Sequence, residues 1–283
     1  MERLIFTSVN GEVIRFDGPP FYLSKVNGLG DVEAETQLQK APYQDGSILL
    51  DSVLGERTIP IEFLIVQDDG YHDVSASRIQ IAKAFNPKLG LGTLRYENDH
   101  IVREIKAVAD SVPVYPDGPR TERIQKGLIN LICPDPYWRS LNVTEEPAFE
   151  PLFQFPFEGE FQMGVQRDRR IITNDGDAPA PLQIEFFGPA LNPIIMNNTT
   201  GEFIKVNQEL LEGEVMKIDT SDSSKSVVFV GVDGTERNVF NWIDLNSTFF
   251  KLVIGENDIE YTADSDIQGA IVNIRYSKLY TAV

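Results

Sequence analysis

Cysteine, histidine and long apolar runs are scarce in this sequence, and each shortage excludes a class of protein. Cys133 is the single cysteine among 283 residues, so no disulfide can form within the chain. No stretch approaches the roughly 20 consecutive apolar residues of a membrane-spanning helix. The first residues, MERLIFTSVNGEVIRF, alternate instead of forming the apolar centre of a signal peptide. We therefore expect no membrane segment and synthesis in the cytoplasm.

Residues that could carry chemistry are also few. The two histidines, His72 and His100, stand beside acids but lack the sequence context of a nucleophilic serine, so structural or surface roles are favoured. No cluster of cysteine and histidine indicates zinc. The pairs Asp68-Asp69 and Asp264-Ser265-Asp266 offer oxygen ligands for calcium but no complete ligand loop, which favours turns.

Phosphate-binding loops are absent as well. Gly28-Leu29-Gly30 and Gly90-Leu91-Gly92 lack both a third glycine and the Lys-Ser/Thr pair that such loops use. Cys133 precedes a proline at the end of a predicted strand, a position typical of a buried and inert thiol. We therefore predict no catalytic residue, no cofactor and no metal site.

Acidic residues outnumber basic ones and give the chain a net charge of -18. Residues 1–140 carry 20 acidic and 15 basic side chains, whereas residues 141–283 carry 23 and 10. Such a chain does not attract phosphate backbones. Its acidity favours solubility, and it is also compatible with a path along which nucleic acid moves without adhering.

Short alternating strands dominate the first half. Asn10-Gly11 between two such runs predicts a hairpin. Residues 47–54 and 57–66 are predicted to pair around Gly55-Glu56. Residues 72–85 have helical periodicity, with Asp73 or Ser75 as the cap and Asn86-Pro87 as the stop. The first half therefore reads as a β-rich domain with one helix.

A proline-rich stretch, CPDPYWRS at residues 133–140, cannot lie inside a central strand and predicts a domain boundary. We place the first domain at residues 1–133 and the second at 134–283. Beyond the boundary no helix is predicted, and many short strands at near-regular spacing predict a β-sandwich. These strands are expected at residues 166–173, 182–187, 202–206, 214–219, 227–230, 249–254 and 271–276.

Aromatic residues leave a binding function open. Five of them could form a platform that stacks on sugar rings, although core packing is the favoured interpretation because Phe240 and Trp242 share one face of a predicted short strand. The five are Tyr137, Trp138, Phe240, Trp242 and Tyr261. The many acids also leave a glycoside hydrolase as a formal alternative, but no carboxylate pair can be selected.

The stretch NDGDAPAPLQIEFFGPALNPI, residues 174–194, combines four prolines and two glycines around one short strand. Pro179 and Pro181 disfavour helix, and Leu182, Ile184 and Phe186 alternate with a mixed face. Gly188-Pro189 and Asn192-Pro193 end the strand. The stretch contains no nucleophile, general base or phosphate cradle, and we interpret it as a corner of the sandwich.

Three blocks of sequence together resemble the distal tail protein family of long-tailed, siphovirus-like bacteriophages and prophages. They are residues 133–138, 174–220 and 244–262, in the order and spacing of that family. The first half agrees through its early hairpin, the helix that ends at Asn86-Pro87-Lys88, and Gly92-Thr93-Leu94-Arg95-Tyr96 after it. The resemblance covers most of the chain.

The resemblance implies a mainly β fold, with an N-terminal β-rich domain that contains one helix and a C-terminal galectin-like β-sandwich. It implies a non-enzymatic structural role as a homo-hexameric ring that joins the tail tube protein to the tail-tip hub protein. Receptor-binding or baseplate proteins are further implied partners, and DNA passes through the lumen in transit. The implied location is the tail tip of the virion, after synthesis in the cytoplasm of the bacterial host.

The segment Val32 to Tyr43 is polar, lacks clear periodicity and lies between strands. We predict that it forms part of a long hairpin or loop that reaches a neighbouring subunit. The competing hypothesis is a lectin-like protein whose C-terminal sandwich binds a saccharide of the host surface, since a galectin-like fold is compatible with both functions.

Overall fold

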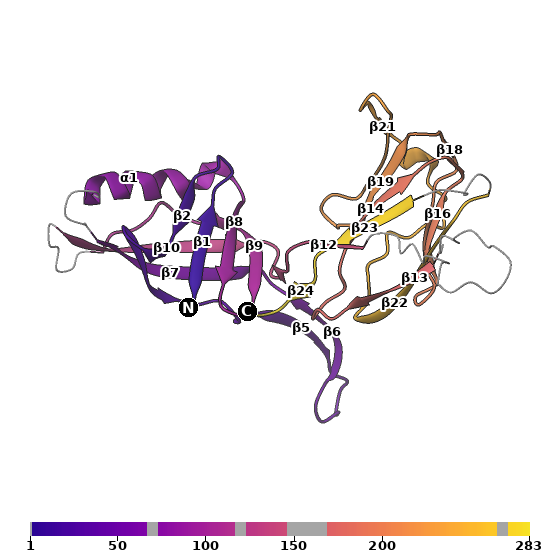
Figure 1. Ribbon diagram of the computed structural model, residues 1–283. Helices are drawn as coiled ribbons and strands as arrows, with labels where there is room; N and C mark the ends of the chain where they lie inside the picture. The colour runs from indigo at the N-terminus through magenta and orange to yellow at the C-terminus, as the bar shows by residue number, and fades with distance from the viewer. Residues whose placement is uncertain (1, 67–72, 117–122, 146–168, 265–270) are drawn as a thin grey trace, which may run out of the picture. The chain divides into compact units, whose positions relative to one another are not determined.

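The computed structural model describes residues 2–66, 73–116, 123–145, 169–264 and 271–283 (Figure 1). As expected, the fold is mainly β, and α1 (Val74–Ala84) is the one α-helix in these residues. The chain forms two compact units, residues 1–141 with 280–283, and residues 142–279. The first unit thus continues past Cys133, where the sequence suggested a boundary, and it also includes the last four residues of the chain.

The first unit is built on a sheet whose strand order is β2-β1-β8-β9-β10-β7-β4-β3, with β11 beside β9. The two ends of this path, β2 and β3, are separated in sequence by Phe16 alone. The Phe16 amide donates to the Leu4 carbonyl, and the Phe16 carbonyl accepts from the Leu23 amide, both at 3.0 Å. Phe16 therefore joins both ends of the path, and the sheet closes on itself as a barrel.

β7 and β10 are the longest strands of this unit, with ten residues each. The full set of strands is β1 (Arg3–Thr7), β2 (Val13–Arg15), β3 (Asp17–Gly18), β4 (Phe21–Val26), β5 (Ala34–Gln39), β6 (Ile48–Leu54), β7 (Arg57–Val66), β8 (Gly92–Glu97), β9 (Val102–Ala109), β10 (Ile124–Cys133), β11 (Trp138–Arg139) and the returning β24 (Leu279–Tyr280). A short 3-10 helix, η1 (Pro87–Leu89), follows α1.

Alternation along the long strands fills the barrel. Every second residue of β7, from Arg57 to Ile65, is buried, and β10 opposite it shows the same period. Phe6 and Phe85 stack at 4.3 Å between ring centroids, which packs the end of α1 against the barrel. The Asp73 side chain accepts from the Ala76 amide and caps the helix, which was one of the two caps expected.

Strand pairing around Gly55 differs from the prediction. The ends of both predicted strands are nearly correct, but β6 does not pair with β7; it pairs with β5, and β7 pairs with β4 and β10. Gly55 and Glu56 therefore do not form a hairpin turn; they lead the chain from an exposed two-stranded ribbon into the barrel wall. Periodicity found the strands but contained no information about their partners.

Arg57 is fully buried, and within the described residues it forms no direct ion pair, although the negative charge of Asp31 acts on it. Its guanidinium donates to three carbonyl oxygens: Gly28 at 2.8 Å, Pro136 at 2.9 Å and Thr281 at 2.6 Å. Burial lowers the pKa of Arg57, and the three carbonyls solvate its charge in place of water. The residue thus links three segments that are far apart in sequence.

Cys133 lies directly opposite Arg57 in the pairing of β10 with β7 and is fully buried. Burial raises the pKa of the Cys133 thiol to about 12, an effect that exceeds the opposing attraction of the Arg57 charge. The thiol is therefore protonated and inaccessible at neutral pH, as its sequence position suggested.

The second unit is a β-sandwich of a six-stranded and a four-stranded sheet, in the orders β12-β23-β14-β19-β20-β21 and β13-β22-β16-β17, with a small β15-β18 pair. Its strands are β12 (Val143–Glu145), β13 (Arg169–Asn174), β14 (Leu182–Phe187), β15 (Ala190–Leu191), β16 (Ile194–Asn197), β17 (Glu202–Lys205), β18 (Glu209–Leu210), β19 (Val215–Asp219), β20 (Ser226–Val230), β21 (Glu236–Asn238), β22 (Gly255–Thr262) and β23 (Ile271–Tyr276). One apolar core lies between the sheets.

Asparagine side chains stabilise the corners of this sandwich. Asn174, at the start of the proline-rich stretch, is fully buried; its amide donates to the carbonyls of Ala178 and Leu252, each at 3.0 Å, and its carbonyl oxygen accepts from the Gly176 amide. The stretch is therefore a corner, as its composition indicated.

Two local predictions in the second half are wrong. Residues 249–254 form no strand apart from the bridge between Ala180 and Leu252. The Asn257 side chain bonds both the amide and the carbonyl of Val253, which holds the chain in a turn before β22 begins at Gly255. Phe240 and Trp242 lie in a 3-10 turn, η2 (Phe240–Trp242), and not in a strand.

Replacing Arg57 should destabilise the first unit. In Arg57→Met the three carbonyls lose their donor while they stay shielded, and we expect a loss of at least about 3 kcal/mol in the free energy of unfolding. Urea denaturation of full-length protein measures it. Arg15→Met, at an exposed position on β2, is the matched control and should change stability by about 0.5 kcal/mol or less. Equal stability of the two variants would contradict this role of Arg57.

Cys133 should resist thiol reagents in the native state. At pH 8 the raised pKa leaves almost no thiolate, and burial blocks access, so we expect little labelling by a maleimide over an hour. The same reagent in denaturant should label one thiol per chain, as intact-mass measurement would detect. Rapid stoichiometric labelling of folded protein would show that the thiol is not enclosed.

Candidate functional site

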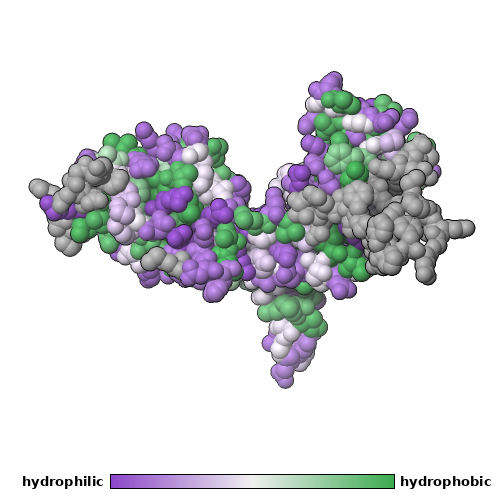
Figure 2. Space-filling model, viewed as in Figure 1, coloured by the Kyte–Doolittle hydropathy of each residue, from purple (hydrophilic) through white to green (hydrophobic). Residues whose placement is uncertain are grey.

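The ribbon formed by β5 and β6, hereafter the β5–β6 hairpin, contributes no side chain to the hydrophobic core of the first unit. The two strands pair with each other and form a separate two-stranded sheet. Nearly all of their side chains are exposed. In Figure 1 the hairpin extends away from the barrel strands of its unit, and Figure 2 shows hydrophobic residues gathered along its stem above a hydrophilic tip.

The register of the hairpin sorts its side chains into two faces. Ala34 pairs with Leu54, Thr36 with Ser52, and Leu38 with Leu49, so one face is uncharged and largely apolar. The acids Glu35 and Asp51 lie on the opposite face. Leu38 and Leu49 are each 60% exposed, although both are large apolar side chains.

An uncovered ribbon of this kind is not expected to be stable alone. An isolated two-stranded hairpin is marginal in water, and its two edges present unpaired backbone groups. Contiguous exposed apolar side chains mark protein interaction surfaces. The segment Val32 to Tyr43 therefore lies in a hairpin, as expected from the sequence, and this hairpin is the strongest candidate interaction site of the chain.

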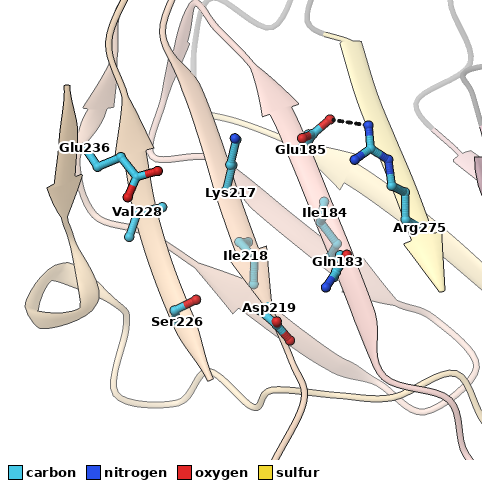
Figure 3. A pocket seen from close by; sticks show the side chains of 10 residues that line it. All are labelled: Gln183, Ile184, Glu185, Lys217, Ile218, Asp219, Ser226, Val228, Glu236 and Arg275. Atoms are coloured by element: carbon cyan, nitrogen blue, oxygen red, sulfur yellow. Dashed lines mark hydrogen bonds and ion pairs between the residues drawn. The ribbon is translucent and has the colours of Figure 1, made fainter. Parts of the chain in front are cut away.

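A hollow of about 400 Å³ on the outer face of the six-stranded sheet is the second candidate (Figure 3). Glu185 of β14 and Arg275 of β23 form an ion pair at 3.2 Å on one side of it. Lys217 of β19 extends between them and β20. The floor is completed by polar side chains such as Gln183 and Ser226.

The lining of this hollow does not resemble a catalytic or a sugar-stacking site. Three carboxylates line it, and two of them have structural partners: Glu185 is engaged by Arg275, and the Asp219 carboxylate accepts from the Ser221 amide and the Ser224 hydroxyl. None of the residues that line it is aromatic. The hollow therefore lacks the ring platform on which saccharide recognition commonly depends.

The five aromatic residues proposed as a platform are not brought together. Tyr137 and Trp138 belong to the first unit, where Trp138 is fully buried, and the other three belong to the second. Tyr261 lies in the core of the sandwich, and Trp242 packs partly against that core. Core packing was thus the correct interpretation for Trp138, Tyr261 and Trp242, whereas Phe240 is 46% exposed and stacks on Phe249 at 5.6 Å.

The remaining sequence candidates occupy turns or lie outside the described residues. His100 is exposed in the turn after β8, where its backbone amide donates to the Asn98 side chain. Asp264 accepts from Asn192 at 2.8 Å and pairs with Lys205 at 3.5 Å. In the described part of the chain, no group of three or more His, Cys, Asp or Glu residues is placed to hold a metal ion. His72, Asp68, Asp69 and Asp266 lie outside that part.

Both glycine pairs serve backbone geometry. Gly28 has a φ of +81°, and a Cβ at this position would lie 2.1 Å from the Thr58 carbonyl oxygen. Gly90 has a φ of +87° and ends η1. Neither region shows the strand-to-helix arrangement of a phosphate loop, since Gly28 is followed by the β5–β6 hairpin and Gly90 by β8.

No helix among the described residues has the length and apolar character needed to span a bilayer. The sequence signal within this hairpin was the poor periodicity of residues 32–43, whereas residues 47–54 were predicted to pair with residues 57–66. The hollow on the sandwich had no comparable signal, because it depends on which of the short strands become neighbours.

Comparison with known proteins identifies the family. Residues 9–133 match the model of the phage tail protein RIFT-related domain, and residues 175–280 match the model of the C-terminal domain of siphovirus-type tail components. The two matches follow the division of the chain into two units. No curated protein sequence matches the chain significantly.

Solved structures agree in fold along the whole chain. The Dit protein of phage SPP1, described as a paradigm of the hub adsorption apparatus in phages that infect Gram-positive bacteria, shares 14% identity at a TM-score of 0.68, with 99% of each chain covered. A chain of the phage P2 baseplate in its activated conformation shares 11% identity at a TM-score of 0.59, with 97% of each chain covered. From the two family models, which together span both units, we conclude that this chain belongs to the distal tail protein family of siphophages, as a structural component of the phage tail.

Proposed function

We propose that this protein forms a homo-hexameric ring at the distal end of the tail tube and joins the tube to the tail-tip hub. The observation that carries the proposal is the β5–β6 hairpin, whose apolar face is uncovered in the single chain. The first unit is the ring-forming part, and the second unit is available to baseplate or receptor-binding proteins at the periphery.

A closed barrel makes the hairpin the natural assembly element. Barrel closure reduces the length of free strand edge in the wall, so the exposed hairpin is the larger surface for a contact between copies. A ring is a heterologous assembly, in which one surface of a subunit meets a different surface of the next. An extended hairpin that reaches from one barrel to the next supplies such a surface.

The charge of the chain suits a passage for DNA. Each copy carries a net charge of -18, to which residues 1–140, most of the ring-forming unit, contribute 20 acidic and 15 basic side chains, so a ring of six first units is acidic as well. Acidic walls repel phosphates, so DNA would move through without adhering. The protein acts in this role without catalysis, which is supported by the structural partners of Glu185 and Asp219 in the hollow and by the enclosed thiol of Cys133.

Charging the apolar face of the hairpin should abolish the ring. In the double variant Leu38→Asp, Leu49→Asp, both carboxylates would be buried without partners at a subunit contact, and we expect loss of the hexamer. Light scattering after size exclusion, with negative-stain imaging of the main peak, measures this. Because both side chains are exposed in the single chain, far-UV circular dichroism and thermal unfolding of the monomer should hardly change.

Val9→Asp is the matched control, because Val9 is an exposed apolar residue of the same unit outside the hairpin. It should leave six-fold rings intact. Rings that persist in the hairpin variant, or wild-type protein that stays monomeric at high concentration with purified tube and hub proteins added, would speak against the proposal.

A further inference from the structure

We propose that the second unit binds a neutral saccharide on the exposed phenyl face of Phe240. The inference goes beyond the hexameric ring and gives a structural subunit a binding activity of its own. Phe240 stacks on Phe249 with the two ring planes 14° apart, so the pair forms a flat ledge beside β21, the last strand of the six-stranded sheet. Neither residue lines the hollow of that sheet.

The fold does not require an aromatic side chain at this position. Among the described residues that pack in or against the core of the sandwich, Trp242 and Phe249 are included and Phe240 is not. Phe240 is 46% exposed, which leaves about 90 Å² of a phenyl side chain open to solvent. Because Phe249 lies against one face of the ring, we assign the open area to the other face.

Hydrogen bonds on both sides hold the ledge in place. Before the ring, the Asn238 side chain accepts from the Phe240 amide at 2.9 Å. After it, the Trp242 carbonyl accepts from the Asn207 amide at 2.8 Å. The phenyl ring is thus presented by a backbone that is already fixed, and a ligand would not have to order it.

The side chains at the ledge suit a sugar. The face of an aromatic ring is the negative part of its quadrupole and attracts the C–H bonds that line one face of a pyranose. Asn238 and Asn241, close to Phe240 in the chain, are both exposed. Amide side chains donate and accept hydrogen bonds, as the hydroxyl groups at the rim of a pyranose also do.

Local charge selects a neutral sugar over an acidic one. Residues 233–244 contain three acids and a single base, Arg237. The Arg237 guanidinium is engaged, since it lies 5.5 Å from the centre of the Trp242 ring and 3.9 Å from the Glu214 carboxylate. A uronic acid or a sugar phosphate would therefore meet repulsion without a free cation to offset it.

One stacked ring makes a weak site. We expect a dissociation constant of about 1 mM for a single site. In the proposed hexameric ring, six such sites would act together on a surface that displays many copies of the sugar, which raises the overall affinity. The binding step itself does not depend on the hexamer and can be measured on either state of the protein.

Saturation-transfer NMR on full-length protein tests the site, with maltotriose, cellotriose and triacetylchitotriose as neutral probes and trigalacturonic acid as the acidic one. We expect transfer to at least one neutral probe. Phe240→Ala should weaken binding about tenfold, as removal of a stacking ring does elsewhere. Phe240→Tyr keeps the flat face and should retain binding. Tyr43→Ala removes an exposed aromatic ring from the first unit and is the matched control, which should bind like wild type.

Phe240→Leu separates stacking from simple apolar contact, because leucine keeps an apolar surface without a flat face. We expect it to lose binding like Phe240→Ala. Full affinity in Phe240→Leu, equal affinity in Phe240→Ala, no transfer to any neutral probe, or preference for trigalacturonic acid would each overturn the inference. Light scattering on the same samples reports the oligomer separately, so the saccharide site and the hexameric ring stand or fall on different measurements.

Discussion

The buried guanidinium of Arg57 is the contact on which the architecture of the first unit depends. A buried charge needs dipoles that replace water, and here three backbone carbonyls supply them, with the charge of Asp31 as a weaker electrostatic contribution. They belong to the chain before the hairpin, to the segment that leaves for the second unit and to the returning C-terminus. One side chain therefore joins the root of the hairpin to two other segments of the first unit, at Pro136 and Thr281.

The C-terminal return has a second anchor of the same kind. The Arg103 guanidinium lies 3.6 Å from the centre of the Tyr280 ring, and it also donates to the Ala282 carbonyl. Tyr280 and Val283 pack partly against the barrel core. Arg57 and Arg103 thus both donate to backbone carbonyls of the C-terminal residues. These bonds explain why the first compact unit contains residues from both ends of the sequence.

Sequence patterns predicted what depends on local periodicity and failed where long-range pairing decides. The alternation of β7, the cap at Asp73 and the corner at Asn174 are local features, and each was visible in composition or spacing. The predicted partner of β6 was wrong. Strands that are adjacent in sequence most often pair, but here β6 pairs with the preceding β5, and β7 belongs to the barrel. Arg57 had no distinguishing signal, since its carbonyl partners lie up to 224 residues away. For residues 32–43 a long hairpin or loop was expected because of their poor periodicity, but the pairing of β5 with β6 was not.

In the proposed ring, the position of Arg57 would link this stability to assembly. Closure of a ring from identical subunits requires a defined angle between the surface that each subunit offers and the surface that it receives. The β5–β6 hairpin leaves the barrel after Gly28 and returns to it at Arg57, and these two residues are joined by a hydrogen bond. Gly28 cannot be larger, because a Cβ would overlap the Thr58 carbonyl. The root of the hairpin is therefore rigid although its strands are exposed, which is what a repeated contact around a ring needs.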